Sequence, residues 1–471
     1  MSGLMNKIYN LTPVLMQNAI LTGYCILLDR ERYGGKYREY KTRFDQLQWQ
    51  PLEKLEEYQN DSLRKLIAHS YDTVPYYRNL FKQHKLKPAD IQCKEDLEKL
   101  PVLTRKNIYE NFNDLKSQAF KNHQLKLGHT SGTTGTPLEV CYDQGVIYAT
   151  YALMDRQYDW AGARLGKKGD RIAVARGNVI VPIEQSTPPY WRHNYYHNQL
   201  LLSSFHLSRE NLPHYFRKLD EFKPVVMDGY PSTLYLLARF LNENQRTFPV
   251  KAVITSSETL YDFQRTEIEK AFQCKVFDYF AAAERVIFAT ECDHHKGHHI
   301  SSEYGITEIL SDDHQPVGRG SLGILTGTSL HNYGMPLIRY LTNDVSGLKD
   351  SYCGCGRKLP LMEDVSTKAE DIIALRDGRM ISPSVLTHPF KPMYSIEESQ
   401  IIQEDYDLVV IKLVPNEKYS EADANHLITE FTARLGKDVT IKIEKVESLE
   451  RTKSGKFKWV ISRVDKGIKV P

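Results

Sequence analysis

The segment Val225-Val226-Met227-Asp228-Gly229-Tyr230-Pro231-Ser232 and the residues that follow it, 233–241, decide the fold class. A short apolar run is followed by a polar turn with glycine and proline, and then by an apolar pattern of helical period. The same order of features recurs after Ala252-Val253-Ile254 and after Lys275-Val276-Phe277. Strand, turn and helix in repetition predict an α/β fold with a largely parallel sheet and functional turns at the strand ends.

The sequence on either side of this region differs in texture. Before about residue 120 it favours helices, and the pattern over residues 62–81 is interrupted at Pro75. Near the C-terminus, residues 400–414 alternate like a β-hairpin, residues 421–435 favour a helix and residues 439–446 favour a strand. We therefore expect a large N-terminal α/β domain with mixed and parallel sheets, residues 1–366, and a small mobile α+β domain, residues 367–471.

The amino-acid composition and net charge of the chain limit the kinds of molecule that it is expected to bind. Of the 471 residues, 41% are hydrophobic and 26% are charged, which is ordinary for a globular chain with a large core. The net charge is only +3 and no Lys/Arg block occurs, so we expect no nucleic-acid partner. The seven cysteines are an odd number spread over a long chain, which argues against a disulfide framework.

One apolar stretch lies near the N-terminus, over residues 11–28. Pro13, Gln17 and Asn18 interrupt it, so it is too broken for a membrane-spanning helix, and it lacks the cleavage site of a signal peptide. Two interpretations remain: a helix packed on its own domain, which we favour, and a helix that rests on a membrane surface. No other segment could span a bilayer, so the expected location is the cytoplasm.

The segment His129-Thr130-Ser131-Gly132-Thr133-Thr134-Gly135-Thr136-Pro137 combines two glycines with five hydroxyl side chains. Backbone N–H groups and hydroxyls in such a turn can wrap a triphosphate. It is not a Walker loop, because no Lys follows the second glycine. A surface linker has the same composition, so composition alone leaves both interpretations open. The candidate phosphate-binding residues are Thr130, Ser131, Gly132, Thr133, Thr134 and Gly135.

This loop resembles the signature of the adenylate-forming enzymes, the superfamily of acyl-CoA synthetases and peptide-synthetase adenylation domains. Val74-Pro75-Tyr76-Tyr77-Arg78, Leu100-Pro101-Val102-Leu103-Thr104 and Gly229-Tyr230-Pro231-Ser232 agree in order with the phenylacetate–CoA ligase-like and CapK-like branch. The residues up to Arg32-Tyr33-Gly34 are similar to the CapK-like group. The resemblance implies that ATP and Mg²⁺ activate a small carboxylic acid as acyl-AMP with release of pyrophosphate. A nucleophile, coenzyme A in the best-known relatives, then takes the acyl group.

Two motifs of the resemblance place the nucleotide. Phe280-Ala281-Ala282-Ala283-Glu284 stands where the family has Tyr-Gly-x-Thr/Ser-Glu, so Phe280 would stack on adenine and Glu284 would hold Mg²⁺. The family's hydroxyl is missing at Ala283. Tyr340-Leu341-Thr342-Asn343-Asp344 resembles Tyr-x-Thr-Gly-Asp, so Asp344 would accept hydrogen bonds from both ribose hydroxyls. Ser257 and Glu258 are further expected nucleotide-binding residues.

Two more motifs concern the small domain. Thr367-Lys368-Ala369-Glu370-Asp371 is similar to the family's Gly-Arg-x-x-Asp hinge, and Lys368 keeps the charge of the Arg without its bidentate fork. Arg451-Thr452-Lys453-Ser454-Gly455-Lys456 resembles the family's Arg-Thr-x-Ser-Gly-Lys loop. Lys456 would therefore be catalytic: it would reach the α-phosphate and the attacking carboxylate and stabilise the charge that builds up during adenylyl transfer. Rotation of the small domain would then withdraw Lys456 and admit the acceptor.

A group of cysteines and histidines predicts a metal site. Cys292 is followed by His294, His295, His298 and His299, and Cys353-Gly354-Cys355 comes later. Thiolate and imidazole ligands suit Zn²⁺, and four protein ligands make a structural site. The resemblance implies zinc on Cys292, His299, Cys353 and Cys355, although the choice between His298 and His299 stays open. Free thiols in a glycine turn are the alternative.

Two other functions remain compatible with the sequence. One is an adenylating enzyme of capsule or exopolysaccharide synthesis that passes an acyl or aminoacyl group to a sugar instead of a thiol. The other is a nucleotide-binding protein without ligase activity, which the departures at Ala283 and at Thr367-Lys368 allow. Weak membrane association through the N-terminal helix and a homodimer are also compatible with the resemblance. A serine hydrolase is not expected, because no Gly-x-Ser-x-Gly elbow occurs.

Overall fold

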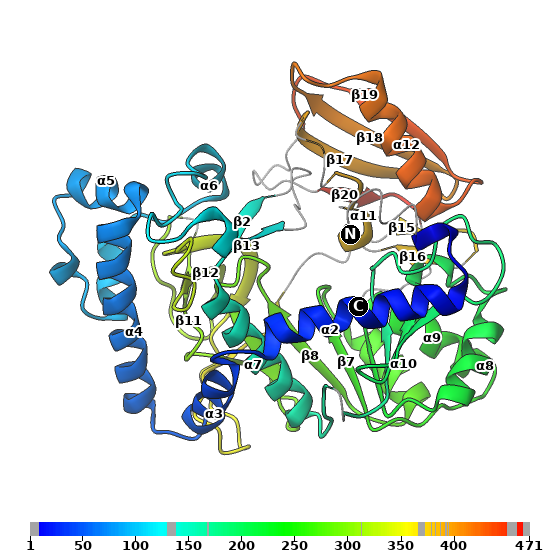
Figure 1. Cartoon of the computed structure of the whole chain (residues 1–471), viewed down its shortest axis with the longest axis horizontal. Helices are drawn as coiled ribbons and strands as arrows, with labels where there is room; N and C mark the ends of the chain where they lie inside the picture. Colours follow the sequence, from blue (N-terminus) through cyan, green and yellow to red (C-terminus); the bar gives the residue numbers. More distant parts are fainter. Residues whose placement is uncertain are drawn as a thin grey trace.

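The computed structural model shows a large N-terminal unit and a smaller C-terminal unit (Figure 1). Mixed α/β architecture with a C-terminal unit is the predicted fold class. The structure describes residues 9–129, 138–166, 169–311, 313–365, 373–377, 379–381, 383–386, 388–390, 393, 395–449 and 459–464.

A nine-stranded sheet organises the large unit, in the order β14-β10-β9-β8-β7-β6-β3-β5-β4. Its central strands are parallel, as predicted, and their apolar runs are buried on both faces. These are β3 (Ile172–Ala175), β5 (Gln199–Leu202), β6 (Val226–Gly229), β7 (Ala252–Ser256) and β8 (Val276–Ala281). Antiparallel strands extend the sheet at both sides: β4 (Trp191–Asn194), β9 (Phe288–Glu291), β10 (His298–Ile300) and β14 (Leu361–Met362).

Alternate residues of the central strands enter two different hydrophobic cores. Val226 and Ile254 pack with residues of α7 (Gln144–Trp160), whereas Met227 and Val253 pack with residues of the helices on the other face. Those helices are α8 (Leu212–Phe222), α9 (Pro231–Glu243) and α10 (Asp262–Phe272). The period of two along each strand thus buries both faces of the sheet.

Helices and a second sheet complete the description of the large unit. The break predicted at Pro75 is confirmed, since α4 (Leu52–Thr73) ends just before α5 (Pro75–Gln83) begins. The other helices of this part are α2 (Val14–Tyr33), α3 (Tyr37–Leu47) and α6 (Arg105–Glu110), with 3₁₀ helices at Pro88–Asp90, Lys94–Lys99, Asn122–Gln124 and Ser204–His206. The second sheet is antiparallel, with β11 (Gly305–Leu310), β12 (Leu322–Ser329) and β13 (Tyr340–Gly347), and a hairpin joins β1 (Lys126–His129) to β2 (Glu139–Tyr142).

The C-terminal unit has its own sheet, in the order β19-β18-β17-β20, and its own hydrophobic core. The predicted hairpin is confirmed by β17 (Ile396–Asp405) and β18 (Leu408–Pro415), the predicted helix by α12 (Glu421–Leu435), and the predicted strand by β19 (Thr440–Lys445). The remaining elements are β15 (Ile373–Ala374), β16 (Met380–Ile381), α11 (Pro383–Leu386), a 3₁₀ helix at His388–Phe390 and β20 (Val460–Ser462). The predicted boundary at residues 366–367 and the predicted hinge at 367–371 lie outside the described residues.

The N-terminal apolar stretch forms α2, which lies across the large unit and contacts β4 and α7 (Figure 1). This agrees with the interpretation that we favoured, a helix packed on its own domain. Among the helices that the structure describes, none is long and apolar enough to cross a membrane.

Candidate functional site

The turn that carries Phe280 and Glu284 begins later than predicted. Strand β8 continues to Ala281, so Phe280 is a half-buried strand residue at the carboxyl edge of the sheet. The N–H of Ala282 then donates to Ile287 O (3.1 Å), and the hydroxyl of Tyr142 donates to Ala283 O (2.6 Å). Because Tyr142 ends strand β2, this contact joins the hairpin that flanks residues 130–137 to the turn at Glu284.

Glu284 is buried and faces two groups from other parts of the chain. The hydroxyl of Tyr340, 56 residues further along, donates to Glu284 Oε1 at 2.8 Å. Burial raises the pKa of Glu284, and the Tyr340 hydroxyl and the Arg105 cation oppose that shift. Arg105 was not predicted from the sequence, although it directly follows the family-like segment that ends at Thr104. Leu103 holds this segment beside β13, since Leu341 N donates to Leu103 O at 3.0 Å.

Asp344 lies within strand β13 and is half-buried. Burial, and secondly the charge of Glu284, raise the pKa of Asp344 to about 7. The two carboxylates that were predicted to bind Mg²⁺ and ribose therefore lie close enough to affect each other's ionisation. Such a pair is stabilised by a bound cation or by hydrogen-bond donors of a ligand, which is what the sequence motifs predict for them.

Strand β7 ends in Ser256, and the two predicted residues that follow it differ in their surroundings. Ser257 is exposed, with a positive φ of 71°. Glu258 Oε2 accepts a hydrogen bond from Ser232 N at 3.0 Å, so this carboxylate stabilises the start of α9. This contact assigns Glu258 a helix-capping role beside the predicted one.

A polar network that the sequence analysis missed lies at the same edge of the sheet. Arg176, just after β3, donates to Asp228 Oδ1 at 2.5 Å and 2.9 Å and to Ser256 Oγ at 2.8 Å. The hydroxyl of Tyr158 donates to the other oxygen of Asp228, and Arg176 also reaches the hydroxyl of Tyr279 at 3.2 Å. Tyr158 lies on α7, and the other groups come from the ends of β3, β6, β7 and β8, the edge at which open α/β sheets bind ligands.

The three loops that were predicted to contact the phosphates and the acid lie outside the described residues. They contain Thr130, Ser131, Gly132, Thr133, Thr134 and Gly135, then Lys368, and finally Lys456. The structure does describe the ends of two of them. His129 pairs with Glu139 across the β1–β2 hairpin, and Trp459 is buried with its Nε1 donating to Ser399 Oγ at 3.1 Å.

Cys292, His299, Cys353 and Cys355 come together in the large unit, with one ligand atom from each within 4.8 Å of the others. Cys292 Sγ lies 3.6 Å from Cys353 Sγ, and His299 Nε2 lies 3.5 Å from Cys355 Sγ. Three of the four residues are buried. Three thiols and one imidazole in this arrangement suit a tetrahedral Zn²⁺ without an open position.

Strand alternation separates the two histidines between which the sequence could not choose. His299 points toward the cysteines and has Nδ1 3.2 Å from Leu359 O. Burial lowers the pKa of His299 to about 4, so the ring is neutral, and Nδ1–H donation leaves the Nε2 lone pair facing Cys355. His298 points to the other face of β10, between Asp278 Oδ2 (3.1 Å) and Asp364 Oδ1 (3.2 Å).

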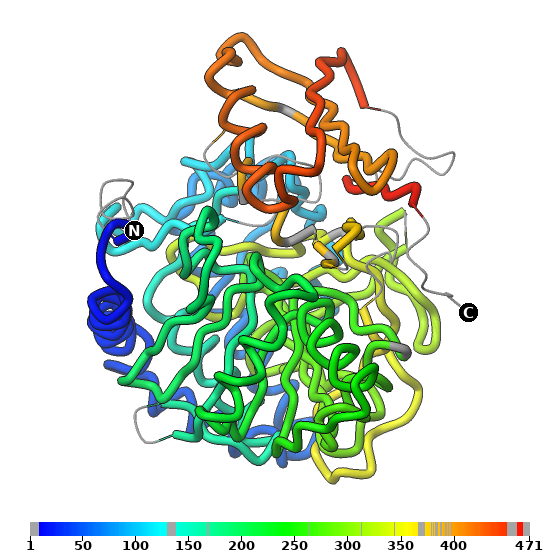
Figure 2. Tube along the Cα trace, turned by 90° about the vertical axis from the view of Figure 1, so that its right-hand side faces the viewer, coloured from blue at the N-terminus to red at the C-terminus, as the bar shows by residue number. Residues whose placement is uncertain are grey.

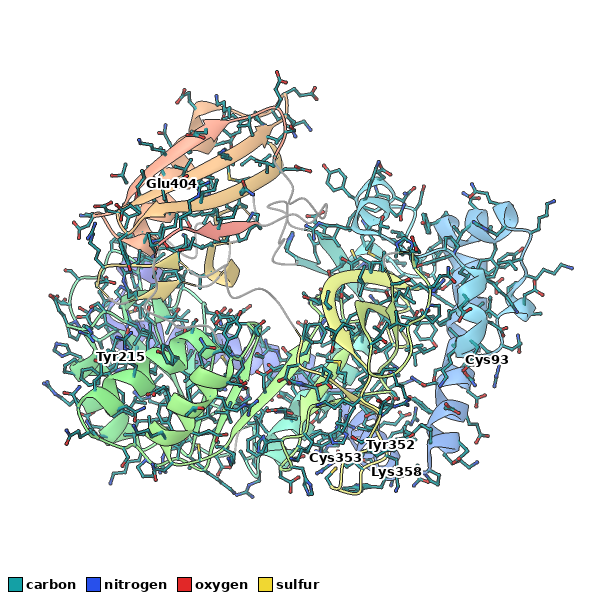
Figure 3. The ribbon with its side chains drawn as sticks, turned by 180° about the vertical axis from the view of Figure 1, so that it is seen from behind. Cys93, Tyr215, Tyr352, Cys353, Lys358 and Glu404 are labelled. Atoms are coloured by element: carbon teal, nitrogen blue, oxygen red, sulfur yellow. The ribbon has the colours of Figure 1, made fainter. Side chains whose placement is uncertain are left out.

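Figure 3 places Cys353 at the end of the large unit that is remote from Glu404 and the C-terminal sheet. Trp160 packs edge-on against His299 with ring centroids 5.5 Å apart, and Arg357 lies over the same Trp160 ring at 4.2 Å. The cysteine–histidine cluster thus sits in a packed, aromatic environment. That position fits a structural role for the cluster.

Comparisons with known proteins agree with these features. A family model described as the CapK C-terminal domain matches residues 373–463. Protein CapK of Staphylococcus aureus is 27% identical over 98% of this chain and 100% of its own length. Phenylacetate–coenzyme A ligase of Thermus thermophilus is 22% identical over 88% of this chain and 98% of its own length.

The fold is also that of solved ligases. A crystal structure of 2-hydroxyisobutyryl-CoA ligase in complex with 2-HIB-AMP and CoA superposes with a TM-score of 0.59, covering 89% of this chain and 91% of the ligase at 19% identity. The chain is therefore similar over most of its length to CapK and to phenylacetate–coenzyme A ligases, and it has the fold of 2-hydroxyisobutyryl-CoA ligase.

Proposed function

We propose that this protein is an AMP-forming acid–thiol ligase, which activates a small carboxylic acid with ATP and transfers the acyl group to a thiol. The observation that carries the proposal is the meeting of the Phe280–Glu284 turn with Tyr340 and Asp344, two motifs distant in the sequence. This chain is similar over most of their length to proteins named as phenylacetate–coenzyme A ligases, and this similarity supports the reaction type. Coenzyme A is the acceptor that those names suggest.

Each residue then has a distinct task. Phe280 stacks on the adenine ring, Asp344 accepts from the ribose hydroxyls, and Glu284 binds Mg²⁺, which neutralises phosphate charge when bound. The hydroxyls and backbone N–H groups of residues 130–135 hold the β- and γ-phosphates. Lys456 stabilises the charge that develops as the carboxylate attacks the α-phosphorus and pyrophosphate leaves. Lys368 lies on the hinge that brings Lys456 to the nucleotide and later withdraws it.

The cysteine–histidine cluster is proposed to hold one structural Zn²⁺ through Cys292, His299, Cys353 and Cys355. Zn²⁺ there would link β10 to the loop before β14, two segments that carry no large hydrophobic core of their own. The neutral ring of His299 supports this assignment, because imidazole binds metal only when it is neutral.

A sugar acceptor is the second candidate. It rests on the resemblance to the CapK-like group, and the match of residues 373–463 to the CapK C-terminal domain includes the unit that would face either acceptor in the second half-reaction. Both candidates share the first half-reaction, so one assay can establish adenylation before the acceptor is known.

That assay is ATP–pyrophosphate exchange with a panel of carboxylic acids, with hydroxylamine added separately to trap acyl-AMP. We expect exchange with at least one acid, and a loss of at least about a hundredfold in Lys456→Ala, as for removal of a transition-state donor. Lys453→Ala in the same loop is the matched control and should stay active, since position 453 varies in the motif. ATP binding without exchange for any acid would favour a nucleotide-binding protein, and an active Lys456→Ala would disprove the role of Lys456.

A further inference from the structure

Helix α2 is attached to the protein by its polar face. Asn18 Oδ1 accepts from His193 N at 2.9 Å, Thr22 Oγ1 accepts from Tyr195 N at 3.2 Å, and Gln17 Oε1 accepts from the guanidinium of Arg192. His193 lies on β4, the edge strand of the large sheet. The side chains of α2 therefore satisfy backbone donors of an open sheet edge, which natural proteins cover to prevent edge pairing.

The opposite face of α2 is apolar and exposed. Leu15 is 78% exposed and Leu27 is 63% exposed, and Met16 and Tyr24 are also exposed. Together with Ala19 and Gly23 they form one stripe at the spacing of a helical face. Leu11, just before the helix, is 87% exposed and extends this apolar stripe. The inner side of α2 also carries half-buried apolar residues such as Ile20, Leu21 and Leu28, so this helix is apolar around much of its circumference, whereas a helix on a globular surface normally has a polar outer face.

Figure 2 shows α2, in dark blue, at the outer edge of the large unit. No other described element covers the apolar stripe, as the exposure of its side chains shows. Apolar side chains clustered on one face of a surface helix favour contact with an apolar phase or a partner, whereas scattered ones need no explanation. The charges beside the apolar stripe and its size decide between a lipid surface and a protein partner.

Charge at the C-terminal end of α2 favours an anionic surface. Arg30, Lys36 and Arg38 are exposed, and within the part of the chain that the structure describes none of them forms an ion pair. Of the acidic side chains nearby, Glu31 pairs with Lys126 (3.2 Å) and Glu39 with Arg43 (2.6 Å), and Asp29 is hydrogen-bonded to Tyr196 (2.9 Å) and His197 (2.8 Å). The three exposed cations therefore make the charge beside the apolar stripe positive.

The size of the stripe argues against a stable protein partner. A specific protein–protein interface takes roughly 20–30 residues from each side. The stripe offers five large apolar side chains, Leu11, Leu15, Met16, Tyr24 and Leu27, which are too few for such an interface. A surface helix can instead contact a lipid interface through an exposed apolar face, an aromatic side chain and flanking cations, without a large partner surface.

We propose that α2 docks this protein reversibly on an anionic phospholipid surface. The helix lies in the plane of the interface, with Leu15, Met16 and Leu27 among the acyl chains and Arg30, Lys36 and Arg38 at the headgroup phosphates. The polar face of α2 stays bound to β4, so the fold does not change on docking. This docking surface is independent of the adenylation chemistry and can be tested without a known acid substrate.

The test is flotation of the full-length protein with vesicles of phosphatidylcholine alone or mixed with phosphatidylglycerol. We expect binding that is strongest to the mixed vesicles, and a fall of at least about tenfold in the double variant Leu15→Gln/Leu27→Gln. Leu322→Gln is the matched control, because Leu322 is 65% exposed on β12, away from α2, and should bind as the wild type does. Arg30→Gln/Lys36→Gln should weaken binding to the anionic vesicles alone.

Several results would overturn the proposal. Absence of binding to either vesicle type would do so, as would equal losses in the Leu322→Gln control. A wild-type dimer in sedimentation that Leu15→Gln/Leu27→Gln dissociates, without vesicle binding, would assign the stripe to a second copy of the chain. Thermal unfolding checks that the exposed-site variants stay folded, since none of these side chains is part of a hydrophobic core.

Discussion

The position of Asp344 on β13 raises the pKa of its carboxyl group from an ordinary value of 3.8 to about 7, mainly through burial. Because the folded-state pKa lies above the unfolded-state value, this carboxyl destabilises the folded protein progressively as pH rises from about 4 to 7, and constantly above that. Asp344→Asn removes the buried charge. We expect the variant to unfold at a Tm higher than wild type by roughly 2–5 °C at pH 8, and by less at pH 5.

The same substitution should weaken ATP binding, because the ribose hydroxyls lose an ionised acceptor. Fluorimetric unfolding scans with and without ATP–Mg²⁺ measure both effects in one experiment. If the variant has the wild-type Tm at both pH values, the carboxyl group of Asp344 does not destabilise the folded protein. If ATP–Mg²⁺ raises the Tm of the variant as much as that of the wild type, Asp344 does not bind the nucleotide.

Residues such as Arg105 and Arg176 mark the limit of what the sequence could predict. A motif was recognisable where its residue types and their spacing lie within one short segment, as at Phe280–Glu284 and Tyr340–Asp344. Arg105 and Arg176 act through neighbours on other strands, and which strand ends adjoin is decided by sheet order, which no single segment encodes. The buried pair of Arg176 and Asp228 therefore had no local sequence signal.

At the scale of the element, the spacing of apolar residues predicted the strands and helices well where an element buries one face or all of its faces. The helix at Glu421–Leu435 and the hairpin at 396–415 have strong periods and were predicted nearly to their ends. The turn after β8 was predicted too early, because Tyr279, Phe280 and Ala281 continue the strand beyond its most apolar residues. Alternation on β10 fixes that His298 and His299 point apart, but the pairing with β14 decides which of them meets the cysteines.

The cluster on β10 gives an element-scale prediction. Purified protein should contain about one zinc per chain, and Cys353→Ser/Cys355→Ser should lose it and unfold at a lower temperature. Cys93→Ser is the control, since Cys93 is a half-buried free cysteine outside the cluster. Elemental analysis and thermal unfolding with and without a chelator make the measurement. Metal-free wild-type protein with the same Tm after chelation would leave these residues as packed thiols.

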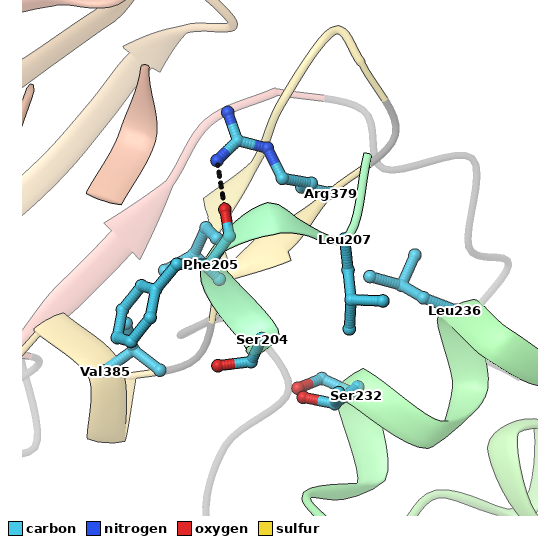
Figure 4. A pocket seen from close by; sticks show the side chains of 9 residues that line it. Ser204, Phe205, Leu207, Ser232, Leu236, Arg379 and Val385 are labelled. Atoms are coloured by element: carbon cyan, nitrogen blue, oxygen red, sulfur yellow. Dashed lines mark hydrogen bonds between the residues drawn. The ribbon is translucent and has the colours of Figure 1, made fainter. Parts of the chain in front are cut away.

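At the scale of the whole molecule, the described contact between the two units centres on Phe205. Phe205 of the large unit belongs to the hydrophobic core of the C-terminal unit, and Arg434 lies 5.7 Å from its ring centroid. Arg379 donates to Phe205 O at 3.3 Å, and Ser204, Leu207, Ser232, Leu236 and Val385 line the small pocket around this contact (Figure 4). Tyr230 packs against the same core, so the described interface is built around two aromatic side chains and two guanidinium groups, and it can separate without unfolding either unit.

Rotation of the C-terminal unit therefore predicts a protease-sensitive linker. Because residues 368–371 are polar and carry no large apolar side chain, limited trypsin digestion should cut at or near Lys368 in the free protein, and ATP with the right acid should slow the cut. Phe205→Ala should accelerate the cut several-fold, because it removes the aromatic anchor while both cores keep their other members. Phe248→Ala, which changes a buried phenylalanine of the other core, controls for general loosening.

A truncated chain of residues 1–366 should stay folded and bind ATP weakly without pyrophosphate exchange, since Lys456 is gone. Full activity of that truncation, or equal acceleration in both phenylalanine variants, would contradict a mechanism in which the C-terminal unit moves as one body.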